Sequence, residues 1–306
     1  MPEHVSRRSF MGQLAAAAGA AALAPALARA TEDAGAGGKA AWQIGCFTRP
    51  WSDQPYTVAF DAIAEAGYKY VGFMTTKMPG GYIITINTPV EVAAKAGEEA
   101  ARRGLTPIAA WGGGLPVRNS VDEGVAALRK LIDQANAAKV PTLLMGGTAR
   151  QAEYDAYYKA IAECCDYAAE KKVTLVIKPH GGLNSTGEQC KKTVEKVGKA
   201  NFRLWYDPGN IFYYSNGKLD PVDDAKNVNG VVSGMCVKDF KPPKNVDVQP
   251  GDGEVKFKEV IQTLQAGGFT SGPLVVETLR PTNDPKERIE LARKAREFVE
   301  SFVNNS

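Results

Sequence analysis

The chain has 306 residues, of which 44% are hydrophobic and 23% are charged, and its formal net charge is +3. This length and apolar fraction suit one large folded domain or two smaller ones. So small a net charge gives no electrostatic reason to expect a nucleic acid or an anionic membrane as partner.

The N-terminal residues have the three parts of an export signal. A twin arginine at Arg7 and Arg8 precedes an Ala/Leu-rich run, which ends in the small-x-small sequence Ala28-Arg29-Ala30. We predict a cleavable twin-arginine (Tat) signal over 1–30, a flexible Gly/Ala-rich lead-in over 31–41, and a periplasmic or otherwise exported protein. The alternative is a membrane anchor, but the apolar run is too short and too weakly apolar to span a bilayer well. We therefore expect no stable membrane insertion after cleavage.

From Ala41 onward, short apolar runs alternate with longer amphipathic ones. The apolar runs predict strands at 42–47, 70–73, 106–110, 142–145, 174–177, 202–206, 231–237 and 274–276. The amphipathic runs predict helices at 57–66, 90–103, 121–138, 152–171, 187–197, 221–226, 257–266 and 285–303. Eight such units predict a single α/β domain over 42–306, a (β/α)8 TIM barrel. The alternative, a doubly wound open sheet, would need a Gly-rich phosphate loop after its first strand, and none is present there.

In a barrel, the residues that follow the strands form one face and carry the chemistry. Two tryptophans at these strand ends, Trp51 and Trp111, could stack on a sugar ring or could simply close the barrel mouth. The other candidates are polar: Lys178, His180, Asp207, Asn210, Lys238 and Glu277. These eight residues are the predicted site.

The stretch 174–182 holds two unusual side chains. His180 is the only histidine besides His4, which falls in the predicted signal, so any imidazole chemistry would take place at this position. Lys178 ends an apolar strand, where an ammonium must either meet a carboxylate or lose its proton. Asp207 and Glu277, at the ends of later strands, are the carboxylates expected to meet it.

Four motifs in the second half of the chain resemble one known family. They are Ile-Lys-Pro-His at 177–180, Tyr-Asp-Pro-Gly-Asn at 206–210, Val-Lys-Asp at 237–239 and Leu-Val-Val-Glu at 274–277. In this order and spacing they resemble the xylose isomerase-like barrels of the sugar phosphate isomerase/epimerase superfamily. The resemblance implies an enzyme that acts on a small carbohydrate by moving protons next to a carbonyl.

The same resemblance implies one divalent cation (Mn, Mg, Co or Zn), with two matching ligands here, Asp207 and Glu277. Lys178 stands where the family has a Glu, and Cys236 where it has a His. An ammonium repels a divalent cation, so the sequence favours a site without a metal. If a metal does bind, Asp207, Glu277 and His180 are the expected ligands.

The residues leave several roles open. For catalysis we expect Lys178, His180, Asp207 and Glu277; for substrate binding we expect Trp51, Trp111, Asn210 and Lys238. Lys178 could stand in for a metal, form a Schiff base, or serve as a structural ion pair. The leading hypothesis is an exported sugar isomerase or epimerase. The alternatives are a keto-glycoside lyase or hydrolase without a metal, and a non-catalytic sugar-binding barrel.

Overall fold

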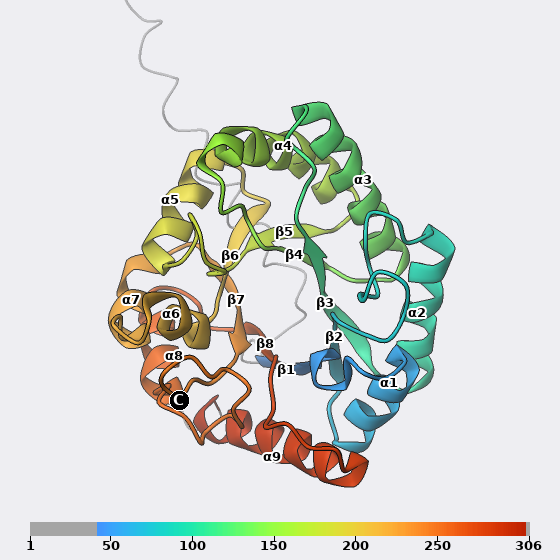
Figure 1. The fold of residues 1–306 in the computed structure, drawn as a ribbon, viewed down its shortest axis with the longest axis vertical. Helices are drawn as coiled ribbons and strands as arrows, with labels where there is room; N and C mark the ends of the chain where they lie inside the picture. The colour runs from blue at the N-terminus through green and yellow to red at the C-terminus, as the bar shows by residue number, and fades with distance from the viewer. Residues whose placement is uncertain (1–41, 304–306) are drawn as a thin grey trace, which may run out of the picture. The chain divides into compact units, whose positions relative to one another are not determined.

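The computed structural model describes residues 42–303, so the predicted export signal and lead-in lie outside the described residues. Eight parallel strands form a closed barrel in chain order, as Figure 1 shows. They are β1 (Trp42–Phe47), β2 (Tyr70–Phe73), β3 (Thr106–Gly113), β4 (Thr142–Met145), β5 (Thr174–Ile177), β6 (Phe202–Tyr206), β7 (Val232–Val237) and β8 (Gly272–Val276). The predicted TIM barrel is confirmed, and the alternative of an open sheet is wrong because β1 pairs with β8.

Helices surround the barrel (Figure 1). They are α1 (Tyr56–Glu65), α2 (Val90–Arg102), α3 (Val121–Ala137), α4 (Gln151–Glu170), α5 (Gly187–Val197), α6 (Pro208–Ser215), α7 (Pro221–Ala225), α8 (Phe257–Ala266) and α9 (Pro285–Val303), with short 3-10 helices η2 (Arg49–Trp51) and η3 (Lys226–Val228). The eight predicted helices are present, most with ends within one residue of those predicted. The sequence did not predict α6 and η2, the two elements that begin directly after strands β6 and β1. Within 42–303, no helix combines the length and the apolar character that a membrane span requires.

Apolar side chains form two cores, one on each side of the strands. The larger core lies between the strands and the surrounding helices, and it takes the inward faces of α1 to α5, α8 and α9. The smaller core fills the barrel interior: Phe47, Met74, Ile108, Ala109, Leu144, Val176, Trp205, Cys236 and Val275. Side chains alternate along a strand, so Met145, Ile177 and Tyr206, each directly after an interior residue, reach the outer core. The filled interior forms the floor beneath the polar residues at the strand ends.

Candidate active site

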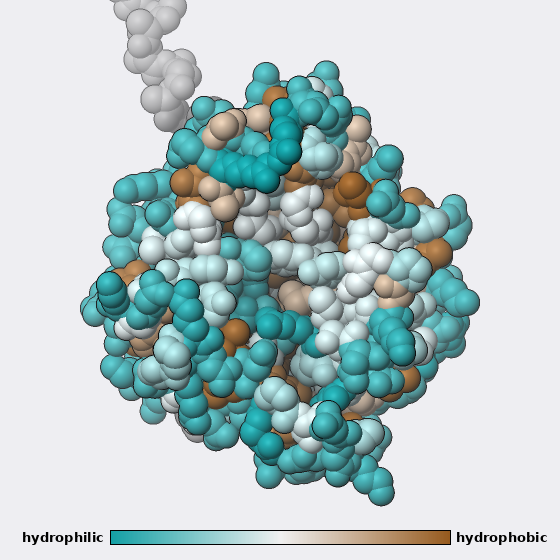
Figure 2. All heavy atoms as spheres, in the orientation of Figure 1, coloured by the Kyte–Doolittle hydropathy of each residue, from teal (hydrophilic) through white to brown (hydrophobic). Residues whose placement is uncertain are grey.

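A pocket of about 360 Å³ lies at the C-terminal ends of the strands. Its walls are Arg49, Met74, Thr75, Tyr82, Trp111, Lys178, His180, Asn210, Tyr213, Tyr214, Lys238, Val246 and Glu277. Figure 2 shows this view of the molecule hollowed near its centre. Six of the eight predicted site residues line the pocket, and Asp207 lies directly behind the wall, where it contacts both lysines.

The floor of the pocket is a network of four buried charges. Lys178 Nζ lies 2.9 Å from Asp207 Oδ2 and 2.5 Å from Glu277 Oε2. Lys238 Nζ lies 3.2 Å from Asp207 Oδ2 and 2.6 Å from Glu277 Oε1. All four side chains are at most 3% exposed. Two lysines and two carboxylates thus alternate around a closed ring, which is the pairing that buried charges require.

The start of α6 fixes the orientation of Asp207. This residue is the N-cap of the helix, and its Oδ1 accepts a hydrogen bond from the backbone N–H of Asn210 at 3.0 Å. Its Oδ2 is left for the two lysines. The Asn210 side chain donates to the Pro179 carbonyl and accepts from Lys238, so it links β5, β6 and β7. Asn210 therefore holds the network together while it lines the pocket.

These contacts determine which groups of the ring carry charge. Burial alone would lower the pKa of Lys178, but Cys236, Glu277 and Asp207 raise it well above its usual value. Burial alone would raise the pKa of Glu277, but Lys178, Lys238 and Arg49 hold it well below its usual value. Lys178 is thus a permanent cation and a poor Schiff-base nucleophile. Glu277 is a permanent anion and a weak proton acceptor.

The two lysines have few hydrogen-bond donors left for a ligand. Lys178 directs its three N–H groups at Asp207, Glu277 and, more weakly, the Cys236 sulfur at 3.8 Å. Lys238 has three acceptors of its own within 3.2 Å. They act on a ligand mainly through their charge rather than through directed hydrogen bonds.

Arg49 is the cation that retains free donors at this pocket, and we did not predict it. Its guanidinium donates to Glu277 Oε1 at 2.9 Å and to Asp247 Oδ1 at 3.3 Å, and its side chain is 31% exposed. A guanidinium has five N–H groups, so several remain available to a ligand. Its position after β1, in the strand-end stretch that includes Trp51, was the signal available in the sequence.

His180 faces the pocket with an unengaged imidazole. Its backbone N–H bonds to the Asn184 carbonyl, but within 42–303 no side-chain or backbone group hydrogen-bonds to the ring. The ring packs near Trp111 at a centroid distance of 4.9 Å and near Tyr214 at 6.0 Å. Desolvation by these walls, together with the charges of Lys178 and Lys238, lowers the pKa of His180 to about 4. At neutral pH the imidazole is therefore uncharged and has a free nitrogen lone pair, and the lowered pKa makes it a weaker base than an ordinary histidine.

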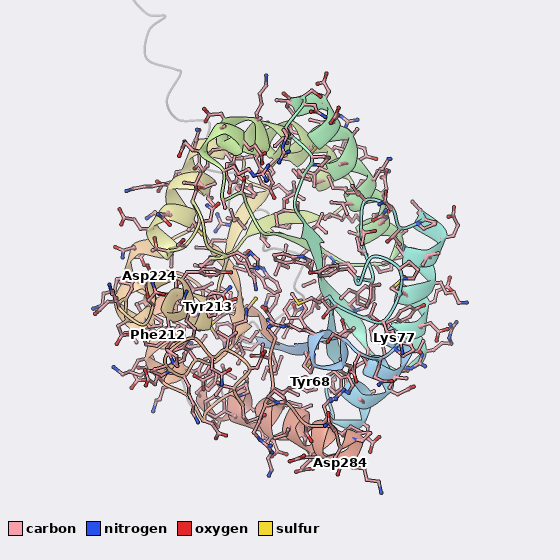
Figure 3. The ribbon with its side chains drawn as sticks, viewed as in Figure 1. Tyr68, Lys77, Phe212, Tyr213, Asp224 and Asp284 are labelled. Atoms are coloured by element: carbon pink, nitrogen blue, oxygen red, sulfur yellow. The ribbon has the colours of Figure 1, made fainter. Side chains whose placement is uncertain are left out.

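Aromatic side chains form the wall around His180. Trp111 lines the pocket as predicted, but Trp51 does not: it is 3% exposed and belongs to the outer core. Trp51 follows the 3-10 turn of η2 into the outer core, so neither stacking on a ligand in this pocket nor closure of the barrel mouth describes its position. Tyr213 and Tyr214 of α6 complete the wall, and Figure 3 labels Tyr213 beside this helix. Gly181, at φ +86°, allows the Tyr214 ring to lie where a Cβ would clash at 2.5 Å.

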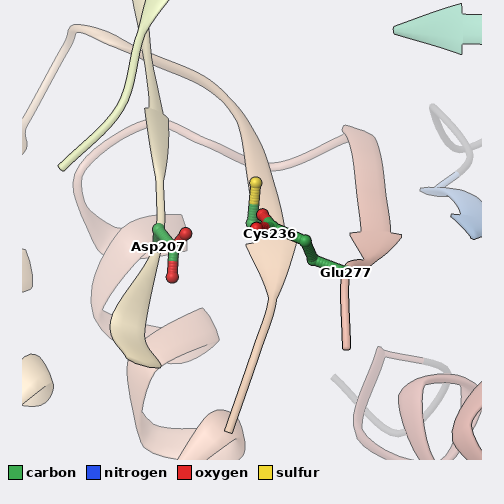
Figure 4. Close-up of side chains that lie close together, drawn as sticks. All are labelled: Asp207, Cys236 and Glu277. Atoms are coloured by element: carbon green, nitrogen blue, oxygen red, sulfur yellow. The ribbon is translucent and has the colours of Figure 1, made fainter. Parts of the chain in front are cut away.

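Asp207, Cys236 and Glu277 form a group of possible metal ligands, drawn in Figure 4, whose ligand atoms lie within 4.8 Å of one another. His180 is not part of this group. The ammonium of Lys178 already contacts all three members, and Lys238 and Arg49 occupy the remaining oxygen of Glu277. Burial also raises the pKa of Cys236 well above its usual value, which disfavours the thiolate that binds metals. These residues do not fit a divalent cation while Lys178 is charged.

The sequence comparison identifies the family. Residues 60–302 match the xylose isomerase-like TIM barrel. The chain belongs to this family. It is 26% identical over 194 residues to L-ribulose-5-phosphate 3-epimerase UlaE of Escherichia coli. That alignment covers 58% of this chain and 63% of the enzyme, which is less than two thirds of the relative's length.

Solved structures share the fold of this chain. A D-psicose 3-epimerase from Clostridium cellulolyticum, solved with D-tagatose, superposes with a TM-score of 0.69 at 12% identity, over 85% of this chain and 99% of that chain. The IolI protein, solved with a zinc atom, gives a TM-score of 0.67 at 15% identity, over the same shares. The resemblance to the sugar phosphate isomerase/epimerase superfamily is confirmed.

Proposed function

We propose that this protein removes a proton from the carbon next to a carbonyl in a sugar or keto-sugar. Lys178 supplies the fixed positive charge and His180 is the base. The observation that carries the proposal is the position of Lys178 Nζ, within 2.9 Å of both Asp207 and Glu277. These are the two carboxylates that the family resemblance assigns to a divalent cation. An ammonium held there stabilises negative charge at the strand ends without a metal.

The reaction follows from the two free groups in the pocket. His180 takes the proton from the carbon, the electrons of that C–H bond form a double bond to the carbonyl carbon, and the π electrons of the carbonyl move to its oxygen, which becomes an enolate oxygen. Arg49 has spare N–H groups to donate to this oxygen, and Lys178 and Lys238 add their charges from below. His180 then returns the proton, either to the same carbon or to the neighbouring one. In the second case the proton of the hydroxyl on the first carbon also moves to the enolate oxygen, so that carbonyl and hydroxyl exchange positions.

Only one base is free in this site, which favours some outcomes over others. Epimerisation requires proton delivery to the opposite face, and Glu277 is engaged by three cations and is poorly suited to it. Isomerisation needs a single base on one face. Elimination from a keto-glycoside also needs one base. The enolate re-forms the ketone, a double bond forms between the α- and β-carbons as the bond to the β-oxygen breaks, and the departing alkoxide takes the proton from His180. We therefore propose that Asp207 and Glu277 hold the two lysines in place. Isomerisation is the first candidate reaction, and elimination by a lyase is the second.

We also propose that the protein works outside the cytoplasm on a small carbohydrate. The twin arginine at Arg7 and Arg8 and the cleavage sequence at 28–30 support export. Neither nucleic acid nor a membrane is proposed as a partner, since the charge is small and the pocket is of small-molecule size.

Proton exchange tests this function whatever product the reaction gives. The protein is incubated in D2O with aldoses, ketoses and 3-keto-glycosides, and deuterium next to the carbonyl is followed by NMR. The wild type should exchange at least one of these, and His180→Asn should slow the exchange about 10²- to 10⁴-fold. The exposed Lys192→Met variant is the control and should retain the wild-type rate.

Two results would contradict the proposal. Equal exchange rates in the wild type and in His180→Asn would exclude His180 as the base. Saturable sugar binding with no exchange for any of these compounds would instead indicate a non-catalytic sugar-binding barrel.

A further inference from the structure

A second pocket, of about 520 Å³, opens beside the first. Its walls are Arg49, Pro50, Ser52, Asp53, Thr75, Asp247, Glu277, Thr278, Leu279, Arg280, Pro281, Thr282, Asn283 and Arg288. Arg49, Thr75 and Glu277 line both pockets, so these three residues form the boundary between them. The loops after β1 and β8, which are neighbours in the barrel, build most of the second pocket. A ligand bound over Lys178 can therefore extend past Arg49 into this space.

The charges around the second pocket balance. Its walls hold three arginines and three carboxylates, and each arginine is already paired. Arg49 bonds to Glu277 and Asp247. The pairs Arg288–Asp53 and Arg280–Glu287 account for the other two. Because the three arginines are balanced by three carboxylates, the walls carry no excess positive charge that would favour a phosphate group, and the free N–H groups of Arg49 remain available to sugar oxygens.

Two threonine hydroxyl groups in the walls have no partner. Thr278 is 2% exposed and its Oγ1 has no hydrogen-bond partner among residues 42–303; the same is true of the buried Oγ1 of Thr75. Nearly all buried polar groups in proteins are hydrogen-bonded, so each of these oxygens calls for a partner. Thr75 lies at the boundary of the two pockets and Thr278 follows Glu277 directly. Both oxygens are closed off from solvent, so a ligand in the pocket does not reach them. The polar side chains open to a ligand are those of Ser52 and Asn283, which line the same pocket, are exposed, and have no hydrogen-bond partner within 42–303.

We propose that the second pocket binds a further, uncharged carbohydrate unit of the substrate. The substrate is then a disaccharide or a glycoside with a carbohydrate aglycone, with its reacting unit beside His180 and its second unit beyond Arg49. This inference rests on the proposed function for the identity of the reacting unit, but the second binding site stands on its own geometry. Balanced charges and the exposed polar side chains of Ser52 and Asn283 suit a neutral polyol, which binds through hydrogen bonds rather than ionic contacts.

The experiment compares ligands of one and two units. Glucose, cellobiose, maltose, gentiobiose, laminaribiose and glucose 6-phosphate are titrated into the protein, and dissociation constants are measured by calorimetry. At least one disaccharide should bind about tenfold more tightly than glucose. Ser52 is exposed in the second pocket, so Ser52→Trp should fill that space and remove the tenfold advantage. Gln262→Trp, on the exposed face of α8, is the matched control and should keep it.

Each other outcome overturns the inference. If no disaccharide binds more tightly than glucose, the second pocket does not bind a carbohydrate unit. If glucose 6-phosphate is the tightest ligand, the pocket binds an anion. If the advantage survives in Ser52→Trp, the second unit lies elsewhere. These binding results are independent of deuterium exchange, so a protein that prefers disaccharides but exchanges nothing would contradict the proposed function alone.

Discussion

Two buried carboxylates in this barrel face opposite surroundings. Glu277, 2% exposed, lies on the pocket floor within 2.9 Å of Lys178, Lys238 and Arg49. Asp224, 1% exposed and labelled in Figure 3, lies in α7 and forms no ion pair with any cation among residues 42–303. It accepts hydrogen bonds from the Gly187 N–H at 2.9 Å and from the Tyr206 hydroxyl at 3.0 Å.

The two groups respond to burial in opposite ways. Burial raises the pKa of Asp224 to about 6, and its two hydrogen bonds only partly offset the increase. Burial also acts to raise the pKa of Glu277, but its three cations hold the pKa well below its usual value. Burial thus disfavours the charged form of both carboxyl groups, and the presence or absence of neighbouring cations determines whether each group stays ionised. The pocket floor is built to stay ionised.

Removal of one cation should have the largest effect. In Lys178→Met, Asp207 and Glu277 lose the ammonium between them, which leaves carboxylates buried with too few partners. We expect the free energy of unfolding to fall by about 3–5 kcal/mol, measured by urea denaturation at pH 7. Lys192→Met, which breaks an exposed ion pair with Glu188, should leave the midpoint unchanged. A loss no larger than this control would mean that the ring contributes little to stability.

Replacement of the Lys178 ammonium by a carboxylate should allow the four-residue network to bind a metal ion. Lys178→Glu adds a third carboxylate to Asp207 and Glu277 and removes the ammonium that excludes a metal. We expect Mn²⁺ to bind this variant at least about 100-fold more tightly than the wild type, or ~2.7 kcal/mol, by calorimetry. Equal affinities would show that Lys178 does not exclude the ion.

The barrel and most of its site could be predicted from the sequence because each strand is an apolar run and a polar residue marks its end. Lys178, Asp207 and Glu277 each end an apolar run, and a closed parallel barrel brings such positions together. The distances could not be predicted, since they depend on the register of strands far apart in the sequence.

Residues in the loops were harder to predict. Trp51 and Arg49 lie within one turn of η2, and the sequence does not say which of the two faces the pocket. The structure turns Arg49 to the pocket and Trp51 into the core. Likewise, no helix was predicted directly after β6, but Asp207 caps a helix there and so brings Tyr213 and Tyr214 to the pocket.

The comparison also predicts how stability depends on pH. The folded pKa of Asp224, about 6, lies above its ordinary value of 3.8, so the folded state binds this proton more tightly. Its contribution to stability is therefore complete below pH 3.8 and is lost as pH rises through 6. Asp224→Asn cannot titrate, so the wild type should gain about 2 kcal/mol relative to this variant between pH 7.5 and pH 4.5. Urea denaturation at both pH values measures the difference, and a constant difference would mean that Asp224 has an ordinary pKa.

The smallest expected effect is a change in the pKa of His180, which the charges of Lys178 and Lys238 also lower. His180 is the only histidine after residue 30, so the imidazole signals of the 31–306 protein in an NMR titration belong to it alone. The wild type should titrate near pH 4, because burial, Lys178 and Lys238 all disfavour the imidazolium. Lys178→Met should raise this pKa by about one unit, or ~1.4 kcal/mol, while Lys192→Met should not. A wild-type value near 6.5 would mean that the cations of the ring leave His180 unaffected, and the pocket would then lack the field proposed to stabilise the enolate.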